Sequence, residues 1–434
     1  MKLTPLHLSP TSTPALFTAL LLAPILGCAL TTLSALATAQ TAATTQNAAP
    51  AASTTPAPSA APASAAATPP SPLPTPSLSG PLQWLPPAVF DAGPLGKLDA
   101  NGIVSGYGLY QDNHLPGDNT GQATLSNGLL FLQKADGPVQ YFIQTGAYAI
   151  PALATPYLSA ADTVKDFFGP VPVAFLKLQV GKNTSFQIGS LPTLLGAEST
   201  FTFQNMNVER GLLWNQENAV NRGIQVNQTL GKYFTASLSW NDGYYSNRYS
   251  WVSGALTFTK GVHSLAFEAM GNAGSTKFQT LATPVQNNSS VYALVYTYTK
   301  GNWIIQPYYQ FSDVPTDVRV GVTQGATTNG GALLLSYAFK HGFSLPARVE
   351  YIKTSGSNAN GAVNLLFGPG SDGTSVTLTP TWQKGAFFAR SDLAWVHAGS
   401  YSQGDAFGTQ GEALNQLRAV VEIGILFGSN ITGK

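Results

Sequence analysis

The sequence predicts an all-β fold: a transmembrane, antiparallel up-and-down β-barrel of about 16 strands (14–16). Three observations support this prediction. Runs of about ten residues alternate between apolar and polar side chains, short Lys/Gly turns recur between the runs, and only 9% of the 434 residues are charged. Tight turns that alternate with longer, more polar loops are typical of bacterial outer-membrane barrels.

The short turns set the repeat of the chain. They lie at Lys134–Gly137, Gly181–Asn183, Gly231–Lys232, Lys260–Gly261, Lys300–Asn302, Lys340–Gly342 and Lys384–Gly385. The alternation between them predicts strands near 103–111, 123–133, 138–149, 173–180, 184–191, 222–230, 233–240, 251–259, 263–270, 291–299, 303–311, 330–339, 343–353, 374–383, 386–397 and 416–427. Seven turns join strands two to fifteen in pairs, so both ends of the barrel lie on the tight-turn, periplasmic side. Pro307, Pro346 and Pro380 fall inside predicted strands and indicate a bulge or a local register error there.

Composition agrees with a barrel whose strands face lipid on one side and water on the other. The charged fraction is far below the roughly 25% of soluble domains, and the mean hydropathy of +0.06 is too low for a bundle of membrane helices. A soluble β-sandwich is the alternative, but it would need more surface charge. A net charge of +1 with scattered lysines offers no basic patch for nucleic acid.

The N-terminal region divides into two predicted segments before the barrel. Residues 1–39 are predicted to be a signal peptide, because Lys2 precedes the apolar stretch Ala15–Leu26 and small residues follow up to Ala39. Cys28 stands in a context that resembles a lipoprotein processing site, so lipidation of Cys28 is the alternative. Residues 40–95 are predicted to be a low-complexity periplasmic linker, since the Ala/Pro/Thr/Ser-rich part up to residue 80 buries too little apolar surface to fold. The barrel then occupies residues 96–434.

Charges within the strands identify the lumenal face. In the last strand Leu417, Val421 and Ile423 share one face, whereas Arg418 and Glu422 share the other. A cation on the lipid face costs about 2–4 kcal/mol at the bilayer midplane, so the charged face is predicted to be the lumen. The same argument gives eight pore-lining candidates of balanced sign, which predicts weak ion selectivity: Lys177, Arg348, Arg390 and Arg418 with Glu268, Glu350, Asp392 and Glu422. Sixteen strands leave room for water; the alternative is that these charges pair across a plugged lumen.

The longest predicted loop carries a family resemblance. Gly189–Glu198 reads Gly-Ser-Leu-Pro-Thr-Leu-Leu-Gly-Ala-Glu, and Asn205–Arg210 and an Arg222-Gly223-Ile224 strand start follow. This stretch resembles beta-barrel porin family 2, the OmpL-like outer-membrane porins. The chain ends in Ile431–Lys434 and not in the aromatic residue that such porins carry at their C-terminus, so Phe427 would supply the assembly signal.

The resemblance implies a porin of the bacterial outer membrane. By analogy with general porins, whose third loop narrows the lumen, the candidates for the constriction are Glu198, Glu209, Arg210, Glu217 and Arg222. The alternative is that these residues cap loops or pair with one another at the rim. The expected partners are outer-membrane lipid, small hydrophilic solutes and ions, and the barrel-assembly machinery, with a homotrimer by analogy alone.

The predicted function is a water-filled channel for passive diffusion of small hydrophilic solutes. We expect no cofactor and no metal, since none of the five histidines lies four residues from another. No nucleophile elbow occurs either, so the chain is not expected to be an enzyme. The alternatives are a channel specific for a sugar or an anion, a non-conducting structural barrel, and an enzyme in a narrower barrel.

Overall fold

The computed structural model describes residues 81–276 and 285–429. The predicted signal peptide and most of the predicted linker lie outside the described residues. The strands are β1 (Ala88–Asp91), β2 (Lys97–Gln111), β3 (Gly121–Lys134), β4 (Val139–Tyr148), β5 (Val173–Val180), β6 (Thr184–Pro192), β7 (Val220–Leu230), β8 (Phe234–Asn241), β9 (Trp251–Lys260), β10 (His263–Asn272), β11 (Ser290–Lys300), β12 (Trp303–Val314), β13 (Ala326–Ala338), β14 (Phe343–Thr354), β15 (Asp372–Leu378), β16 (Thr381–Lys384), β17 (Phe387–Ser400) and β18 (Asn415–Phe427). The α-helix is α2 (Ala160–Asp166), and the 3₁₀ turns are η1 (Gly93–Leu95), η2 (Thr202–Gln204), η3 (Leu213–Gln216), η4 (Gln286–Asn288), η5 (Val318–Val320) and η6 (Asn358–Asn360).

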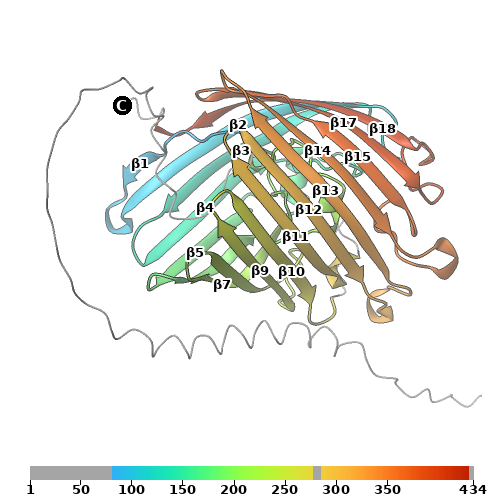
Figure 1. Cartoon of the computed structure of the whole chain (residues 1–434), viewed down its shortest axis with the longest axis horizontal. Helices are drawn as coiled ribbons and strands as arrows, with labels where there is room; N and C mark the ends of the chain where they lie inside the picture. Colours follow the sequence, from blue (N-terminus) through green and yellow to red (C-terminus); the bar gives the residue numbers. More distant parts are fainter. Residues whose placement is uncertain (1–80, 277–284, 430–434) are drawn as a thin grey trace, which may run out of the picture. The chain divides into compact units, whose positions relative to one another are not determined.

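The strands form one antiparallel sheet that closes on itself. From β2 onward each strand pairs with the next, except that β15 and β16 both lie between β14 and β17. Strand β18 pairs with β2 from Arg418 opposite Gln111 to Phe427 opposite Gly102. Figure 1 shows this seam, where the red C-terminal strands lie beside the blue β2. Since β15 and β16 are two parts of one crossing and β1 is a short addition to the base of β2, the barrel has 16 spanning strands. The predicted fold and strand number are therefore confirmed.

Proline does not shift the register of the strands. Pro307 and Pro346 lie within β12 and β14, opposite Leu333 and Ser336, without the predicted bulge. Pro380 separates β15 from β16, yet Leu378 pairs with Leu393 and Thr381 with Arg390, so the ladder to β17 keeps its alignment across the gap. Because proline lacks an N–H, the ladder stops at that residue and resumes beyond it. The register shifts instead in the β2–β3 pair, between Ser105 and Gly106, and in the β15–β17 pair, between Asp372 and Gly373.

The recurring glycine in the short turns has a conformational reason. Each of the seven turns contains a glycine with positive φ, between +58° at Gly385 and +79° at Gly342. Tight hairpins that follow the twist of their strands require this region of backbone space, which side chains disfavour. At Gly342 an added Cβ would also lie 2.0 Å from the carbonyl oxygen of Gln383 on the neighbouring hairpin. The repeat therefore marks the turns at one rim of the barrel.

The predicted division between lipid face and lumen holds in the last strand. Leu417 and Ile423 are 54% and 64% exposed on the outer surface, whereas Glu422 between them in the alternation is fully buried. The inward face is not polar on every strand, however. Phe131, Phe142 and Phe175 point inward from β3, β4 and β5 and form a buried aromatic cluster. The interior is thus apolar on one wall and charged on another.

Two regular segments, one in a loop and one before the barrel, were not predicted. The helix α2 lies in the loop between β4 and β5, where Ser159 caps its N-terminus by accepting from the backbone N–H of Asp162 at 3.2 Å. Residues 81–95, which the sequence assigns to the linker, contain β1 and η1 and lie on the base of the barrel. Among the described residues, no helix has the length and apolarity that a membrane crossing requires.

Candidate pore constriction

Loop 3 (residues 193–219), between β6 and β7, folds into the barrel. Every residue from 200 to 213 is buried, although nearly all of the segment is irregular. Its phenylalanines anchor it to the aromatic wall: Phe201 packs edge-on against Tyr148 of β4, and Phe203 against Phe131 of β3, with ring centroids 5.2 and 5.5 Å apart. The longest predicted loop therefore occupies the lumen instead of projecting from the rim.

A buried irregular loop has backbone N–H and C=O groups that need partners. The charged residues of β17 supply several. Arg390 donates to the carbonyl oxygens of Thr202, Asn205 and Met206 at 2.9–3.1 Å. Two residues along the strand, the Asp392 carboxylate accepts from the backbone N–H of Glu209 at 2.7 Å. These wall charges therefore hold the backbone of loop 3 in place.

Strand β14 repeats the arrangement. Arg348 donates to the Glu198 carboxylate at 2.6 Å and to the Glu209 carbonyl oxygen at 2.7 Å, and its Nε lies 3.2 Å from Glu350. Glu350 in turn accepts from the backbone N–H of Leu212 at 3.0 Å. Gly211 permits this approach, because an added Cβ there would lie 1.9 Å from a Glu350 oxygen. Arg348 thus binds two carboxylates, and both wall charges of β14 bind part of the loop backbone.

Strand β18 completes the charged wall. Arg418 lies 3.2 Å from the Glu209 carboxylate and donates to the carbonyl oxygen of Ala152 in loop 2 (residues 149–172). Glu422 lies 3.6 Å from Arg390 and accepts from Thr202, at the tip of loop 3, at 3.1 Å. Strands β14, β17 and β18 therefore carry three arginines and three carboxylates. All six side chains contact loop 3, and Arg418 also contacts loop 2.

Arg210, the arginine of loop 3, binds backbone carbonyl groups of loop 3 and of loop 2. Arg210 is fully buried and donates to the carbonyl oxygens of Pro151, Ser199 and Thr200, while its guanidinium lies 5.5 Å from the Trp214 ring centre. Burial lowers the pKa of Arg210 to about 10, so the side chain stays charged at neutral pH. Arg210 therefore fastens loop 3 to loop 2.

The far end of loop 3 reaches the opposite wall. Glu217 accepts from the Tyr308 hydroxyl and from Gln310 Nε2 at 2.7 Å, both on β12, while its second oxygen has no protein partner. Burial raises the pKa of Glu217 well above its ordinary value of 4.5. Glu268 of β10 accepts from the backbone N–H of Gly196 at 2.7 Å. Loop 3 is thus bound on both sides of the lumen.

The two remaining predicted site residues lie apart from this network. Arg222, at the start of β7, donates to Asp242 at 2.8 Å and lies 3.9 Å from the Tyr245 ring centre. It therefore pairs at the loop end of the barrel with a residue outside the predicted set. Lys177 is buried on the inward face of β5, opposite Gln187 of β6.

A polar surface, here called the hydroxyl face, lines the other half of the barrel near the short turns. Its members are inward-facing, partly or fully exposed, and uncharged: Asn227, Thr229, Thr235, Ser237, Thr257, Thr259, Ser264, Thr297 and Gln306, on β7 to β12. They are cross-strand neighbours, as with Thr229 opposite Thr235. Exposed hydroxyl and amide groups on an inward face indicate water next to this wall.

The N-terminal segment contacts loop 3 from the short-turn end. Trp84 packs edge-on against Phe131 of β3 and Phe203 of loop 3, with ring centroids 5.2 and 5.6 Å apart. Gln83 exchanges two backbone–side-chain hydrogen bonds of 2.7 Å with Gln383 of β16. The segment before β1 is thus held on the barrel by the hydrogen bonds of Gln83 and by the packing of the Trp84 ring.

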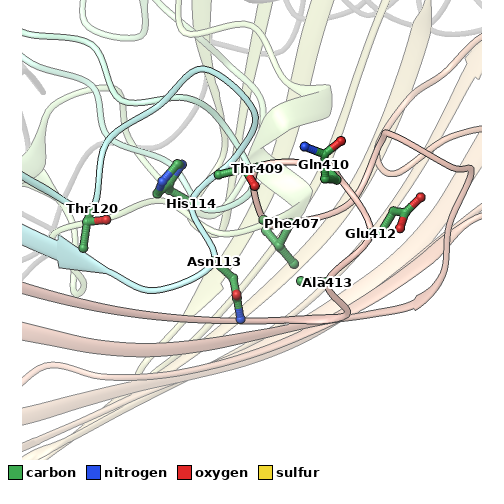
Figure 2. Close-up of a pocket in the computed structure, with 9 residues that line it drawn as sticks. Asn113, His114, Thr120, Phe407, Thr409, Gln410, Glu412 and Ala413 are labelled. Atoms are coloured by element: carbon green, nitrogen blue, oxygen red, sulfur yellow. The ribbon is translucent and has the colours of Figure 1, made fainter.

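A separate cavity of about 390 Å³ opens at the loop end of the barrel, between the β2–β3 and β17–β18 loops (Figure 2). Its lining is mostly polar and includes His114, Thr409, Gln410 and Glu412. The backbone N–H of Gly408 donates to the carbonyl oxygen of Asn113 at 2.9 Å and joins the two loops. This cavity lies above the charged strands and takes no part in binding loop 3.

Several residues that bind the predicted charges were not themselves predicted. Asn127, Thr202, Tyr308 and Asp242 are partners of predicted charges, but a polar residue in a strand or loop does not reveal which distant charge it meets. Tyr308 and Gln310 did carry a signal, since residues two apart on a strand share one face. Trp84 carried none, because it follows a low-complexity stretch.

The family model described as "Putative beta-barrel porin-2, OmpL-like" matches residues 97–427, which is nearly the whole barrel. The chain belongs to this porin family. The protein is accordingly an outer-membrane porin. No curated protein sequence matches it.

Solved structures share the fold of this porin at low sequence identity. The outer membrane channel DcaP of Acinetobacter baumannii is 9% identical with a TM-score of 0.54, over 78% of this chain and all of DcaP. The anion-selective porin from Comamonas acidovorans is 14% identical with a TM-score of 0.52, over 76% of this chain and 99% of that one. At these identities the comparison establishes a common barrel architecture.

Proposed function

We propose that this porin conducts small hydrophilic solutes passively, along a path between loop 3 and the hydroxyl face. The observation that supports this path is the contrast between the two halves of the interior. Strands β14, β17 and β18 are covered by loop 3, whereas β7 to β12 keep inward hydroxyl and amide groups partly exposed. Water-accessible, uncharged groups allow solutes to exchange hydrogen bonds with the wall as they pass.

Most of the charged candidates hold loop 3 in place in this proposal. Glu198, Glu209, Arg210, Arg348 and Arg390 anchor loop 3 and so set the width of the constriction. Glu268 of β10 and Glu217 at the end of the loop hold loop 3 to the opposite wall, and Lys177 lies buried on the inward face of β5. Because the anchoring charges are paired, we expect weak ion selectivity.

Planar-bilayer conductance of the refolded protein tests this function. The wild type should form open channels whose conductance increases with salt and does not saturate with small neutral solutes. Replacing Glu198 and Arg210 in turn should change the conductance, because each holds the position of loop 3. No conductance in the wild type, across several lipid compositions, would contradict the proposal.

A substrate-specific channel for a sugar or an anion is the second candidate. The burial of residues 200–213 supports it, because a lumen occupied by a fixed loop leaves a narrower path than an open barrel. The solved Comamonas porin is described as anion-selective. Conductance that saturates, or that one class of solute blocks, would favour this candidate over general diffusion.

We also propose the route by which the protein reaches its membrane. Residues 1–39 would direct secretion, residues 40–80 would span the periplasm as a linker, and the assembly machinery would insert the barrel. Mass spectrometry of the mature N-terminus tests the cleavage site and the lipidation of Cys28. We expect no enzymatic activity, which assays for lipid and peptide hydrolysis by the purified protein would test.

We further propose a homotrimer that associates through the side of the barrel that contains the short strands β5 and β8. Strands β5 and β8 have 8 residues each, against 15 in β2. Eight residues extend about 26 Å and, at the usual tilt, cover about 20 Å of an apolar band that is about 25 Å tall. Such a mismatch favours association. Cross-linking between cysteines introduced on β5 would yield trimers if this wall is the interface.

A further inference from the structure

Every short turn of the barrel carries a lysine, and the lysines collect at one rim. With Lys97 at the base of β2 they form a set of eight, here called the lysine rim: Lys97, Lys134, Lys182, Lys232, Lys260, Lys300, Lys340 and Lys384. Within residues 81–276 and 285–429, the carboxylates at this rim are Asp91, Asp99 and Asp136. Among the described residues, Lys134 pairs with Asp136 at 2.8 Å and the other seven have no carboxylate within 4.0 Å.

The opposite rim has the reverse charge. Among residues 81–276 and 285–429, its loops and strand ends carry ten carboxylates: Asp112, Asp118, Asp162, Asp166, Asp242, Asp313, Asp317, Asp372, Asp405 and Glu412. In the same described ranges its cations are Lys165, Arg222, Arg248, Arg319 and Lys353. The net charge of +1 for the whole chain therefore conceals a strong asymmetry along the barrel axis.

Several of these lysines face away from the lumen. Lys300 pairs across the hairpin with Trp303, and Lys384 with Phe387, so each shares a face with its partner. Trp303 and Phe387 are 47% and 58% exposed on the outer surface. Lys260 lies on the outward side of β9, and its Nζ lies 5.8 Å from the Tyr233 ring centre. The ammonium groups thus stand just beyond a belt of outward aromatic rings.

This position coincides with the level of lipid head groups. Outward aromatic rings mark the boundary between hydrocarbon and head groups in barrels. Short turns lie on the periplasmic side, so the facing leaflet consists of glycerophospholipids. We propose that the lysine rim is a binding surface for anionic glycerophospholipid of the periplasmic leaflet, with head-group phosphates bound at the outward-facing lysines Lys260, Lys300 and Lys384.

The outward direction separates this proposal from a role in conduction. A cation that lines the pore must face the lumen, whereas Lys260, Lys300 and Lys384 share the face of lipid-exposed residues. An anionic cell-wall polymer beneath the membrane is the competing partner. It would meet the turn tips and would have no reason to favour lysines beside aromatic rings.

Lipid selectivity measured by tryptophan quenching tests the proposal. The full barrel would be refolded into phosphatidylcholine vesicles that contain either brominated phosphatidylglycerol or brominated phosphatidylcholine, and the quenching of tryptophan fluorescence compared. Trp303 and Trp382 lie at the lysine rim and report its neighbouring lipids. A surface lysine contributes about fivefold to the affinity for anionic lipid at low ionic strength. The wild type should therefore prefer phosphatidylglycerol, and this preference should weaken in salt.

The decisive variant replaces Lys260, Lys300 and Lys384 with glutamine and should abolish the preference. Lys→Arg at the same positions should retain it, which separates charge from a folding defect. Lys353→Gln is the matched control, because Lys353 faces outward at the other rim. Equal quenching by both lipids in the wild type, or an unchanged preference in the glutamine variant, would overturn the proposal. So would binding of isolated cell-wall sacculi that depends on these lysines without any lipid preference.

Discussion

Replacing Arg348 with methionine should release loop 3 from β14 without unfolding the barrel. Arg348 binds Glu198 and the Glu209 carbonyl oxygen on the loop and Glu350 on its own strand, and it is fully buried. The barrel wall is held by backbone ladders that the substitution does not touch. The effect should therefore appear in loop 3.

The expected magnitude follows from the geometry. At 2.6 Å and an effective dielectric constant of about 20, the attraction between Arg348 and Glu198 is about 6 kcal/mol before desolvation is counted. Desolvation of both groups offsets most of this attraction, but removing one partner leaves the other buried and unpaired. Such losses cost about 3–5 kcal/mol. Local opening of loop 3 should therefore become about 10²- to 5 × 10³-fold more frequent.

Hydrogen exchange of the refolded protein measures this opening. The backbone N–H groups of Glu209 and Gly211 are bound to Asp392 and Glu198, so their protection reports the attachment of the loop. Glu198→Gln should have a smaller effect, and the double variant should recover part of the loss because no unpaired carboxylate remains at Glu198. Single-channel recordings should show a larger and noisier conductance in Arg348→Met.

A matched control separates the buried pair from charge in general. Arg319 pairs with Asp317 on an exposed loop, and its replacement by methionine should leave the protection of loop 3 unchanged. Two results together would refute the reasoning. Protection of residues 200–213 in Arg348→Met would stay within about threefold of the wild type, and the coupling energy between Arg348 and Glu198 in the double-mutant cycle would be below about 0.5 kcal/mol.

Three further predictions test other parts of the interior. Trp84→Ala should cost about 2 kcal/mol of local stability and raise the conductance, because the ring packs on loop 3 from the short-turn end; bilayer recordings check this. At pH values above 4.5, Glu217→Gln should raise the temperature midpoint of unfolding, and in acid it should have no effect. The reason is that the pKa of Glu217 is raised in the folded protein, so the wild type loses stability as this carboxyl group ionises. Thermal unfolding followed by circular dichroism at several pH values measures this difference. Gly342→Ala should lower the yield of folded barrel more than Gly385→Ala does, because both turns have positive φ but only the first meets the Gln383 carbonyl oxygen at 2.0 Å; equal yields on heat-modified gel mobility would refute the steric argument.

The barrel was predictable because its signals are local. Alternation with a period of two follows from contact with lipid and water on opposite sides of each strand, and a residue's own neighbours reveal it. The seven Lys/Gly turns fixed the pairing of strands, so all sixteen predicted crossings appear within a few residues of their predicted limits. Even Pro380 changed one strand into two without altering its register.

The helix α2 and the ordered stretch 81–95 were missed for a physical reason. Helix α2 has 7 residues, which is too short for a periodic pattern, and it is stabilised by its Ser159 cap and by contact with the barrel. Trp84 and Gln83 gain their partners only when Phe203 and Gln383 are brought to the same end of the barrel. The two residues of each contact lie more than 100 positions apart in the chain, so local sequence patterns do not reveal them.

The sequence by itself determined the closed sheet, the face of each strand and the inward position of the arginines and carboxylates, because exposure to hydrocarbon forbids the reverse. Only the tertiary structure decided what those charges do. Arg348, Arg390 and Asp392 bind the backbone of loop 3, which lies far away in the chain. A buried loop without regular structure must satisfy its polar groups somewhere, and the partners depend on how the closed barrel brings distant strands around it.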